Sequence, residues 1–272
     1  MYIDKIHLEG RTLDEAILLF KEELERVLVS SNGSIKENEL PHFSFEDSPI
    51  ITGTSRKLGG YYDSETGEYV HYDENDDENV YIRKTYKEWH NGIQLTFKKD
   101  ILIGHYKNIP DKTDLFNEVL RETNSFFAKK NIEFQSKEDQ ILFGWGSKIK
   151  KRLDYFKSKI GYNKDYDIKS KKGNPFDAQK RDGVSMLNVN YYKGYAFYNN
   201  KLFRYDDFGN YNYGVAGKAF GFDDWVLKSA AGIAQVLNPG SPIGTVSSYL
   251  DDPKDQYMIM LGIEHWNNHF KK

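Results

Sequence analysis

The segment from residue 205 to residue 217 constrains this chain more than any other part of its sequence. It reads YDDFGNYNYGVAG and combines three glycines with aromatic residues and two adjacent carboxylates. Glycines permit a positive φ angle or a close approach of two backbones. Tyr211 and Tyr213 alternate with asparagines, and this alternation predicts a short strand with one aromatic face. We therefore expect the segment to form a functional site.

Composition excludes several classes of protein. The chain has 272 residues, of which 39% are hydrophobic and 15% aromatic, so we expect a globular protein. No apolar run approaches the roughly 18 residues needed to span a bilayer. The N-terminus lacks a basic stretch followed by an apolar one, so we expect no cleaved secretory signal. The chain has no cysteine, which excludes disulfides, thiolate zinc sites and a cysteine nucleophile.

Charge divides the chain into two unequal parts. Residues 1–112 contain 14 basic and 22 acidic residues, whereas residues 113–272 contain 24 basic and 19 acidic residues. A basic part suits a polyanionic partner such as nucleic acid or a bacterial wall polymer. We predict a boundary near Pro110, between an N-terminal α+β domain at 1–112 and a second domain at 113–272.

The predicted fold class is α+β. The N-terminal domain is expected to hold a strand at 2–8, a helix at 12–31 and a small antiparallel sheet. That sheet is predicted from a hairpin at 61–72 around Ser64-Glu65-Thr66-Gly67 and from strands at 80–86, 93–97 and 101–106. The C-terminal domain is expected to be mainly helical with a short β-hairpin. Its predicted elements are helices at 114–130 and 136–161, a strand at 191–198, and helices beginning after Asp223 and at Pro253.

Paired carboxylates are the main candidates for chemistry. Asp206 and Asp207 stand at the start of the glycine-rich segment, where an aspartate can also bond its own backbone. Asp252 precedes Pro253 and is predicted to cap a helix. Asp251 and Asp255 are not needed for that cap. They either project with Asp207 into a shared cleft or favour the helix dipole.

Three blocks of the sequence resemble the polymorphic toxin type 44 (bacterial toxin 44) family. The blocks are Tyr166-Asp167-Ile168-Lys169, the segment 205–217, and Asp251-Asp252-Pro253-Lys254-Asp255-Gln256, in the order and spacing of the family. Tyr166 replaces a tryptophan of the family pattern. The resemblance covers roughly residues 115–272 and implies a secreted toxin domain. It further implies delivery by a contact-dependent or type VI secretion apparatus and a cognate immunity protein as partner.

The resemblance leaves the reaction open, and we expect a hydrolase that cleaves peptidoglycan in the periplasm of a target cell. Glycoside hydrolysis needs one carboxylic acid and a second carboxylate. Asp167 and Asp207 are the candidate pair, and no cofactor or metal is required. The full set of candidate catalytic residues is Asp167, Lys169, Asp206, Asp207, Asp251, Asp252 and Asp255. The candidate substrate-binding residues are Tyr205, Asn210, Tyr211, Tyr213 and Lys218.

The alternative is a ribonuclease that acts in the target cytoplasm. Lys169, Lys218 and Arg204 would then stabilise the negative charge of the phosphorane. A metal-dependent version would gather Asp207, Asp251 and Asp255 around Mg²⁺. The shared blocks contain no histidine, which favours the wall hydrolase. A non-enzymatic immunity or adaptor protein is the third hypothesis. Residues 1–112 are expected to serve delivery, chaperone docking or substrate binding.

Overall fold

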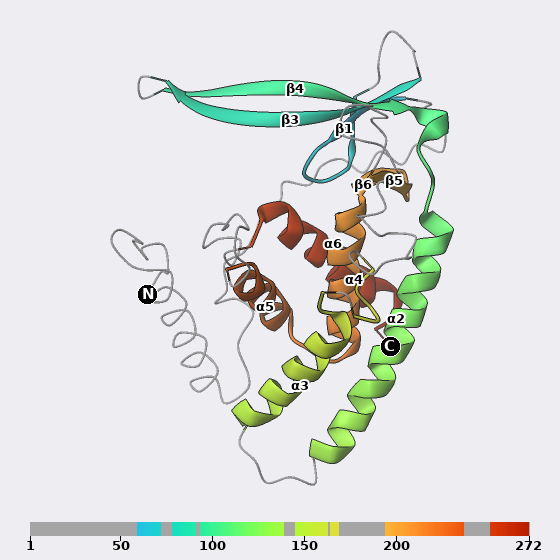
Figure 1. The fold of residues 1–272 in the computed structure, drawn as a ribbon, viewed down its shortest axis with the longest axis vertical. Helices are drawn as coiled ribbons and strands as arrows, with labels where there is room; N and C mark the ends of the chain where they lie inside the picture. Colours follow the sequence, from blue (N-terminus) through green and yellow to red (C-terminus); the bar gives the residue numbers. More distant parts are fainter. Residues whose placement is uncertain are drawn as a thin grey trace.

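The computed structural model of this protein describes residues 59–71, 78–90, 93–138, 145–162, 164–168, 194–236 and 251–271. These residues form a four-stranded sheet, a separate two-stranded hairpin and a group of helices. In Figure 1 the sheet lies at the top, the helices lie below it, and the hairpin lies between them. The predicted α+β fold class is confirmed.

The sheet consists of β1 (Gly60–Asp63), β2 (Tyr69–His71), β3 (Asn79–His90) and β4 (Ile93–His105), in the order β2-β1-β3-β4. The predicted hairpin at 61–72 is confirmed as β1 and β2. The sheet is mixed rather than antiparallel as predicted. After β2, which pairs antiparallel with β1, the chain crosses to the other side of β1, and β3 runs parallel to β1 there. The strands predicted at 93–97 and 101–106 are one strand, because β4 pairs with β3 along its whole length.

The remaining elements are mainly helical. They are α2 (Thr113–Glu138), α3 (Trp145–Ile160), α4 (Tyr205–Ala219), α5 (Asp224–Val236) and α6 (Pro253–His269), with the hairpin β5 (Tyr195–Tyr198) and β6 (Lys201–Arg204). A single 3₁₀ turn, η2 (Tyr106–Asn108), leads from the sheet to α2. The helices predicted after Asp223 and at Pro253 are confirmed. The helix predicted from residue 136 begins later, because α2 continues to Glu138.

The strand predicted around Tyr211 and Tyr213 is wrong, because the whole segment lies in α4. Phe208, Tyr211 and Val215 are buried at intervals of three and four residues, which is the spacing of one helix face. The two tyrosines therefore point in different directions. Tyr211 packs in the core beside Phe116, whereas the hydroxyl of Tyr213 donates a hydrogen bond to the carbonyl of Leu227.

The glycines of this segment allow α4 to pack closely against neighbouring helices. A Cβ atom added to Gly214 would collide with the carbonyl oxygen of Ile259 in α6. One added to Gly262 of α6 would collide with the carbonyl oxygen of Tyr211. Gly217 leaves room for the side chain of Leu227 in α5. The expected close backbone approach is therefore present, but it occurs between helices and not in a turn.

The sheet and the helical part share one of three apolar clusters. Tyr62, Ile82 and Ile103 of the sheet pack with Phe197 and Leu202 of the β5–β6 hairpin. The other two clusters lie on either side of α4 and are formed mainly by helices. The division into domains at 1–112 and 113–272 stays a prediction. The shared cluster shows that the described sheet is packed onto the second of these parts.

Some expectations fall on residues that are not described. The strand predicted at 2–8 and the helix predicted at 12–31 lie outside the described residues. Within the described ranges, no helix has the length and apolar character needed to cross a membrane.

Candidate functional site

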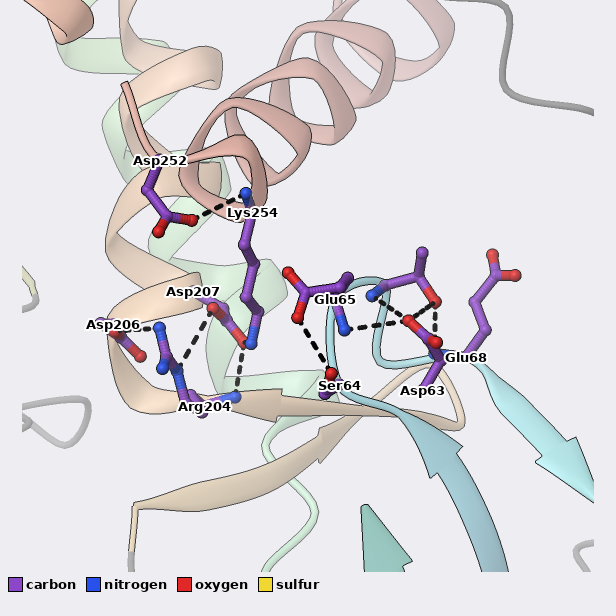
Figure 2. Close-up of polar contacts among 10 residues, drawn as sticks. Asp63, Ser64, Glu65, Glu68, Arg204, Asp206, Asp207, Asp252 and Lys254 are labelled. Carbon is purple, nitrogen blue, oxygen red and sulfur yellow. Dashed lines mark hydrogen bonds and ion pairs between the residues drawn. The ribbon is translucent and has the colours of Figure 1, made fainter. Parts of the chain in front are cut away.

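The candidate site lies where the first turn of α4 meets the first turn of α6 (Figure 2). Asp207 of α4 has no exposed surface, and its Oδ2 atom lies 2.9 Å from Nζ of Lys254 in α6. Lys254 is itself buried, with 7% of its surface exposed. An ion pair removed from water needs further polar contacts to offset its desolvation. The surroundings of Asp207 supply only some of them.

Arg204 supplies the contacts that hold Asp207 in place. It ends β6 and precedes the first residue of α4, and its backbone N–H donates to Oδ2 of Asp207 at 2.7 Å. A carboxylate in the first turn of a helix commonly accepts this bond from the N-cap residue. The guanidinium Nη2 of Arg204 donates to Asp206 at 2.7 Å. The two adjacent aspartates therefore bind the same arginine through different atoms.

Burial raises the pKa of Asp207 to about 6, from an ordinary value of 3.8. Lys254 opposes this increase as a nearby cation and hydrogen-bond donor, Asp206 adds to it, and Arg204 also opposes it. Burial dominates because the charged carboxylate loses its hydration. Asp207 therefore exchanges its proton close to neutral pH, as a general acid or base must.

Several buried polar atoms at this site have no hydrogen-bond partner. Oδ1 of Asp207 and Nε of Arg204 form no hydrogen bond, although they lie 3.9 Å apart as an ion pair. The side-chain amides of Asn210 and Gln256 each leave one further buried atom without a hydrogen bond. Since buried polar groups are nearly always hydrogen-bonded, such a concentration marks the start of α4 and α6 as unusual.

Three of the predicted catalytic carboxylates converge on Arg204. Burial lowers the pKa of this guanidinium, but the negative charges of Asp206 and Asp207, together with Tyr195 and Asp255, outweigh burial and raise it. Arg204 is therefore a permanent cation among carboxylates. The structure brings Asp206, Asp207 and Asp255 into one electrostatic cluster.

The turn between β1 and β2 faces this cluster. In Figure 2 the side chain of Glu65 is turned toward Lys254. Charged groups of both the cluster and the turn act on the pKa of Tyr195 in β5. Burial raises its pKa to about 12, Arg204 opposes the increase, and the carboxylates of Asp207, Asp206 and Glu65 add to it.

Lys254, Glu65 and Tyr195 were not among the candidate catalytic or substrate-binding residues predicted from the sequence. Lys254 could have been found, because it lies between two candidate aspartates in the third block. Glu65 and Tyr195 carry no local signal, since only the tertiary packing brings the β1–β2 turn and β5 to the start of α4.

Asp251 and Asp252 organise the start of α6. Asp252 caps the helix as predicted, because its side chain accepts a hydrogen bond from the backbone N–H of Lys254 at 2.8 Å. Asp251 accepts one bond from the backbone N–H of Asp252 and another from Nε2 of Gln256, each at 3.0 Å. Gln256 in turn donates to the carbonyl of Lys228 in α5. These contacts make both aspartates part of the framework between α5 and α6.

Asp167 lies in the turn that follows α3 and approaches α4 beyond Asp207. Asp167 is 8% exposed and follows Tyr166, whose carbonyl accepts a hydrogen bond from Asn212 of α4 at 3.3 Å. Asn212 lies five residues beyond Asp207, which is about 7.5 Å along a helix axis. The turn that carries Asp167 therefore lies beside the middle of α4, and the pairing of Asp167 with Asp207 stays a prediction. Lys169 lies outside the described residues.

The candidate substrate-binding residues are spread over different surroundings. Tyr211 is 6% exposed and belongs to the core, and Tyr205 packs against the same cluster. Lys218 lies at the far end of α4, about 16 Å along the helix axis from Asp207. Its Nζ atom is 2.6 Å from Oδ1 of Asp224 in α5. Asn210 and Tyr213 are partly buried. A surface hollow lies at Asp111, Thr113, Asp114, Leu115, Asn199 and Asn200, and none of the candidate residues lines it.

The geometry of a magnesium site is not present in the described part of the chain. No group of three or more histidine, aspartate or glutamate side chains is placed there to hold a metal ion. Asp251 is bonded to Gln256, whereas Asp207 is bonded to Arg204 and Lys254. Asp207 and Asp251, two of the three carboxylates expected around Mg²⁺, therefore have separate partners.

A comparison with protein families identifies the class of this domain. Residues 155–268 match the model of a bacterial toxin family. The family is described as bacterial toxin 44, and the match contains all three sequence blocks that resemble it. The predicted resemblance to this family is therefore confirmed for residues 155–268. Comparisons with curated proteins and with solved structures each found no match.

Proposed function

We propose that this protein is an antibacterial effector toxin that hydrolyses the glycan of peptidoglycan, with Asp207 as the proton donor. One observation carries the proposal. Asp207 is a fully buried carboxyl group with a pKa of about 6, next to the cations Lys254 and Arg204. The toxin family of residues 155–268 supports the role as a toxin.

The chemistry requires a carboxyl group that keeps its proton near neutral pH. An ordinary aspartate is ionised there, but an apolar environment can raise the pKa until the group acts as a general acid. Asp207 has such a pKa because burial outweighs the effect of Lys254. As proposed, the reaction uses water and carboxyl groups and needs no cofactor.

The proposal makes one structural demand. Asp207 has no exposed surface in the described conformation, so the groups that cover it must move when the glycan binds. The Oδ1 atom of Asp207 supports contact with a ligand, because it accepts no hydrogen bond from the surrounding residues. A sugar hydroxyl or the glycosidic oxygen would satisfy it.

A ribonuclease is the second candidate, and the cations beside Asp207 favour it. Lys254 and Arg204 could stabilise a phosphorane in the way that catalytic cations do. The carboxylates around Arg204 already neutralise much of this positive charge, however. We therefore place the wall hydrolase first.

The toxin family also supports a cognate immunity protein as partner. We propose that a secretion apparatus delivers the toxin to the periplasm of a competing bacterium, where its wall substrate lies. Under the ribonuclease alternative, the site of action is the target cytoplasm.

Expression in two compartments of a susceptible bacterium tests the proposal. The wall hydrolase should be toxic only when it carries a periplasmic signal, and cells should round up and release muropeptides. Toxicity confined to the cytoplasm, with degraded RNA, would establish the ribonuclease instead.

The variant Asp207→Asn tests the residue. It should reduce muropeptide release by about 10²–10⁴-fold, the usual contribution of general acid catalysis. Asp154→Asn changes an exposed aspartate of α3 and is the matched control, with activity near that of the unmodified protein. Hydrolysis of purified peptidoglycan should also slow as pH rises above about 6, because Asp207 then loses its proton. Full activity of Asp207→Asn would overturn the proposed role.

A further inference from the structure

The turn between β1 and β2 is closed by several hydrogen bonds within it. Oδ1 of Asp63 accepts hydrogen bonds from the backbone N–H groups of Glu65 and Thr66, at 2.9 and 2.8 Å, and from the hydroxyl of Thr66 at 3.1 Å. Gly67 closes the turn with a φ angle of +70°, a conformation that glycine adopts without strain. These contacts stabilise the backbone conformation that carries Glu65.

The same turn is anchored to the strand that leads into the candidate site. The backbone N–H of Leu202 in β6 donates to the carbonyl of Gly67 at 2.8 Å, and Nζ of Lys201 lies 2.9 Å from Glu68. A Cβ atom on Gly67 would lie 2.6 Å from the carbonyl oxygen of Leu202, which is a steric clash. Since β6 ends at Arg204, the turn is held at a constant position relative to the start of α4.

Glu65 is the exposed group of this turn. Its carboxylate accepts a hydrogen bond from the hydroxyl of Ser64 at 2.9 Å, and Ser64 is itself buried. Among the described residues Glu65 forms no ion pair, although Figure 2 shows it facing Lys254. It acts electrostatically on Tyr195, as Asp207 does. Glu65 and Asp207 therefore lie near one tyrosine, one exposed to solvent and the other buried.

We propose that Glu65 is the second catalytic carboxylate of this site. The active site would then be composite, with Asp207 from the bacterial toxin 44 domain and Glu65 from a sheet that lies outside residues 155–268. This inference rests on the proposed hydrolase function. It offers Glu65 in place of Asp167 as the partner of Asp207, because Glu65 faces Lys254, the residue that is ion-paired with Asp207 (Figure 2).

The two carboxyl groups have complementary roles in the proposed step. Asp207 gives its proton to the oxygen of the departing sugar as the glycosidic C–O bond breaks. Glu65 accepts a proton from a water molecule whose oxygen forms the new bond to the sugar carbon. Solvent then carries a proton from Glu65 back to Asp207, which restores both groups. An exposed carboxylate such as Glu65 is suited to act as the general base, because water must reach it.

The test uses the full chain and purified peptidoglycan. Glu65→Gln should lower muropeptide release by about 100-fold or more while the thermal unfolding temperature stays unchanged. Glu118→Gln removes an exposed glutamate of α2 and is the matched control. Glu65→Ala should be inactive, and added formate should restore part of its activity by replacing the missing carboxylate. A purely structural role would not respond to formate.

The outcomes separate this inference from the proposed function. Activity of Glu65→Gln close to that of the control would overturn the role of Glu65, as would a failure of formate to restore Glu65→Ala. If Asp207→Asn remained active as well, the proposed hydrolase mechanism itself would be wrong. If Asp207→Asn lost activity while Glu65→Gln kept it, the proposed hydrolase function would stand. The second catalytic carboxylate would then be a residue other than Glu65.

Discussion

Two buried aspartates at the starts of neighbouring helices have opposite surroundings. Both carboxylate oxygens of Asp251 accept hydrogen bonds, one from the backbone of Asp252 and one from Gln256. Asp207 uses Oδ2 for Arg204 and Lys254, while Oδ1 has no hydrogen bond and burial raises the pKa of the group. A carboxylate with satisfied oxygens holds the chain together. One with a raised pKa and an oxygen that accepts no hydrogen bond is suited to proton transfer.

The largest effect expected from this contrast is on the pH dependence of stability. The folded protein holds the Asp207 proton up to a pH of about 6, whereas the unfolded chain releases it near 3.8. Between these values the folded state binds more protons, so the free energy of unfolding should fall as pH rises, by about 3 kcal/mol in total. Below this window both states are protonated, and above it both are ionised.

Urea unfolding between pH 3 and pH 7 would measure this slope. Asp207→Asn cannot titrate, so the slope should become shallower in this variant than in the unmodified protein. Parallel profiles for the two proteins would show that Asp207 has an ordinary pKa, and the contrast with Asp251 would disappear.

A smaller effect is expected from Asp251→Ala. The change removes the acceptor of the Asp252 backbone N–H and one of the two acceptors of the Gln256 amide, which should cost about 1–3 kcal/mol of unfolding free energy. Activity per folded molecule should stay near that of the unmodified protein. Urea unfolding combined with muropeptide release would measure both quantities. An inactive but stable Asp251→Ala would place Asp251 in the catalytic site.

The smallest effect is expected from Asp252→Ala, which removes the cap of α6. The loss should be about 1 kcal/mol, typical of an N-cap residue. Asp252→Asn is the matched control, because asparagine caps a helix about as well as aspartate. Thermal unfolding of the two variants would compare them. Equal losses in both would show that the charge of Asp252, and not its cap, stabilises the helix.

Much of the fold was predictable because its signals are local. The Ser64-Glu65-Thr66-Gly67 hairpin and the helix start at Asp252-Pro253 depend on turn and cap chemistry within a few residues. The segment 205–217 was predicted wrongly, because its Tyr–Asn alternation concealed the helical spacing of Phe208, Tyr211 and Val215. Its glycines allow close contact with helices that are distant in the sequence. The neighbouring residues in the chain therefore could not predict this role.

The sequence by itself determined the α+β class, the toxin family of residues 155–268 and the cap at Asp252. These depend on hydrophobic periodicity, short-range hydrogen bonds and characteristic blocks of residues. Only the tertiary structure decided which carboxylates share an environment. Burial and pairing depend on how α4, α6 and the β1–β2 turn pack, and the pKa of Asp207 follows from that packing rather than from its neighbours in the chain.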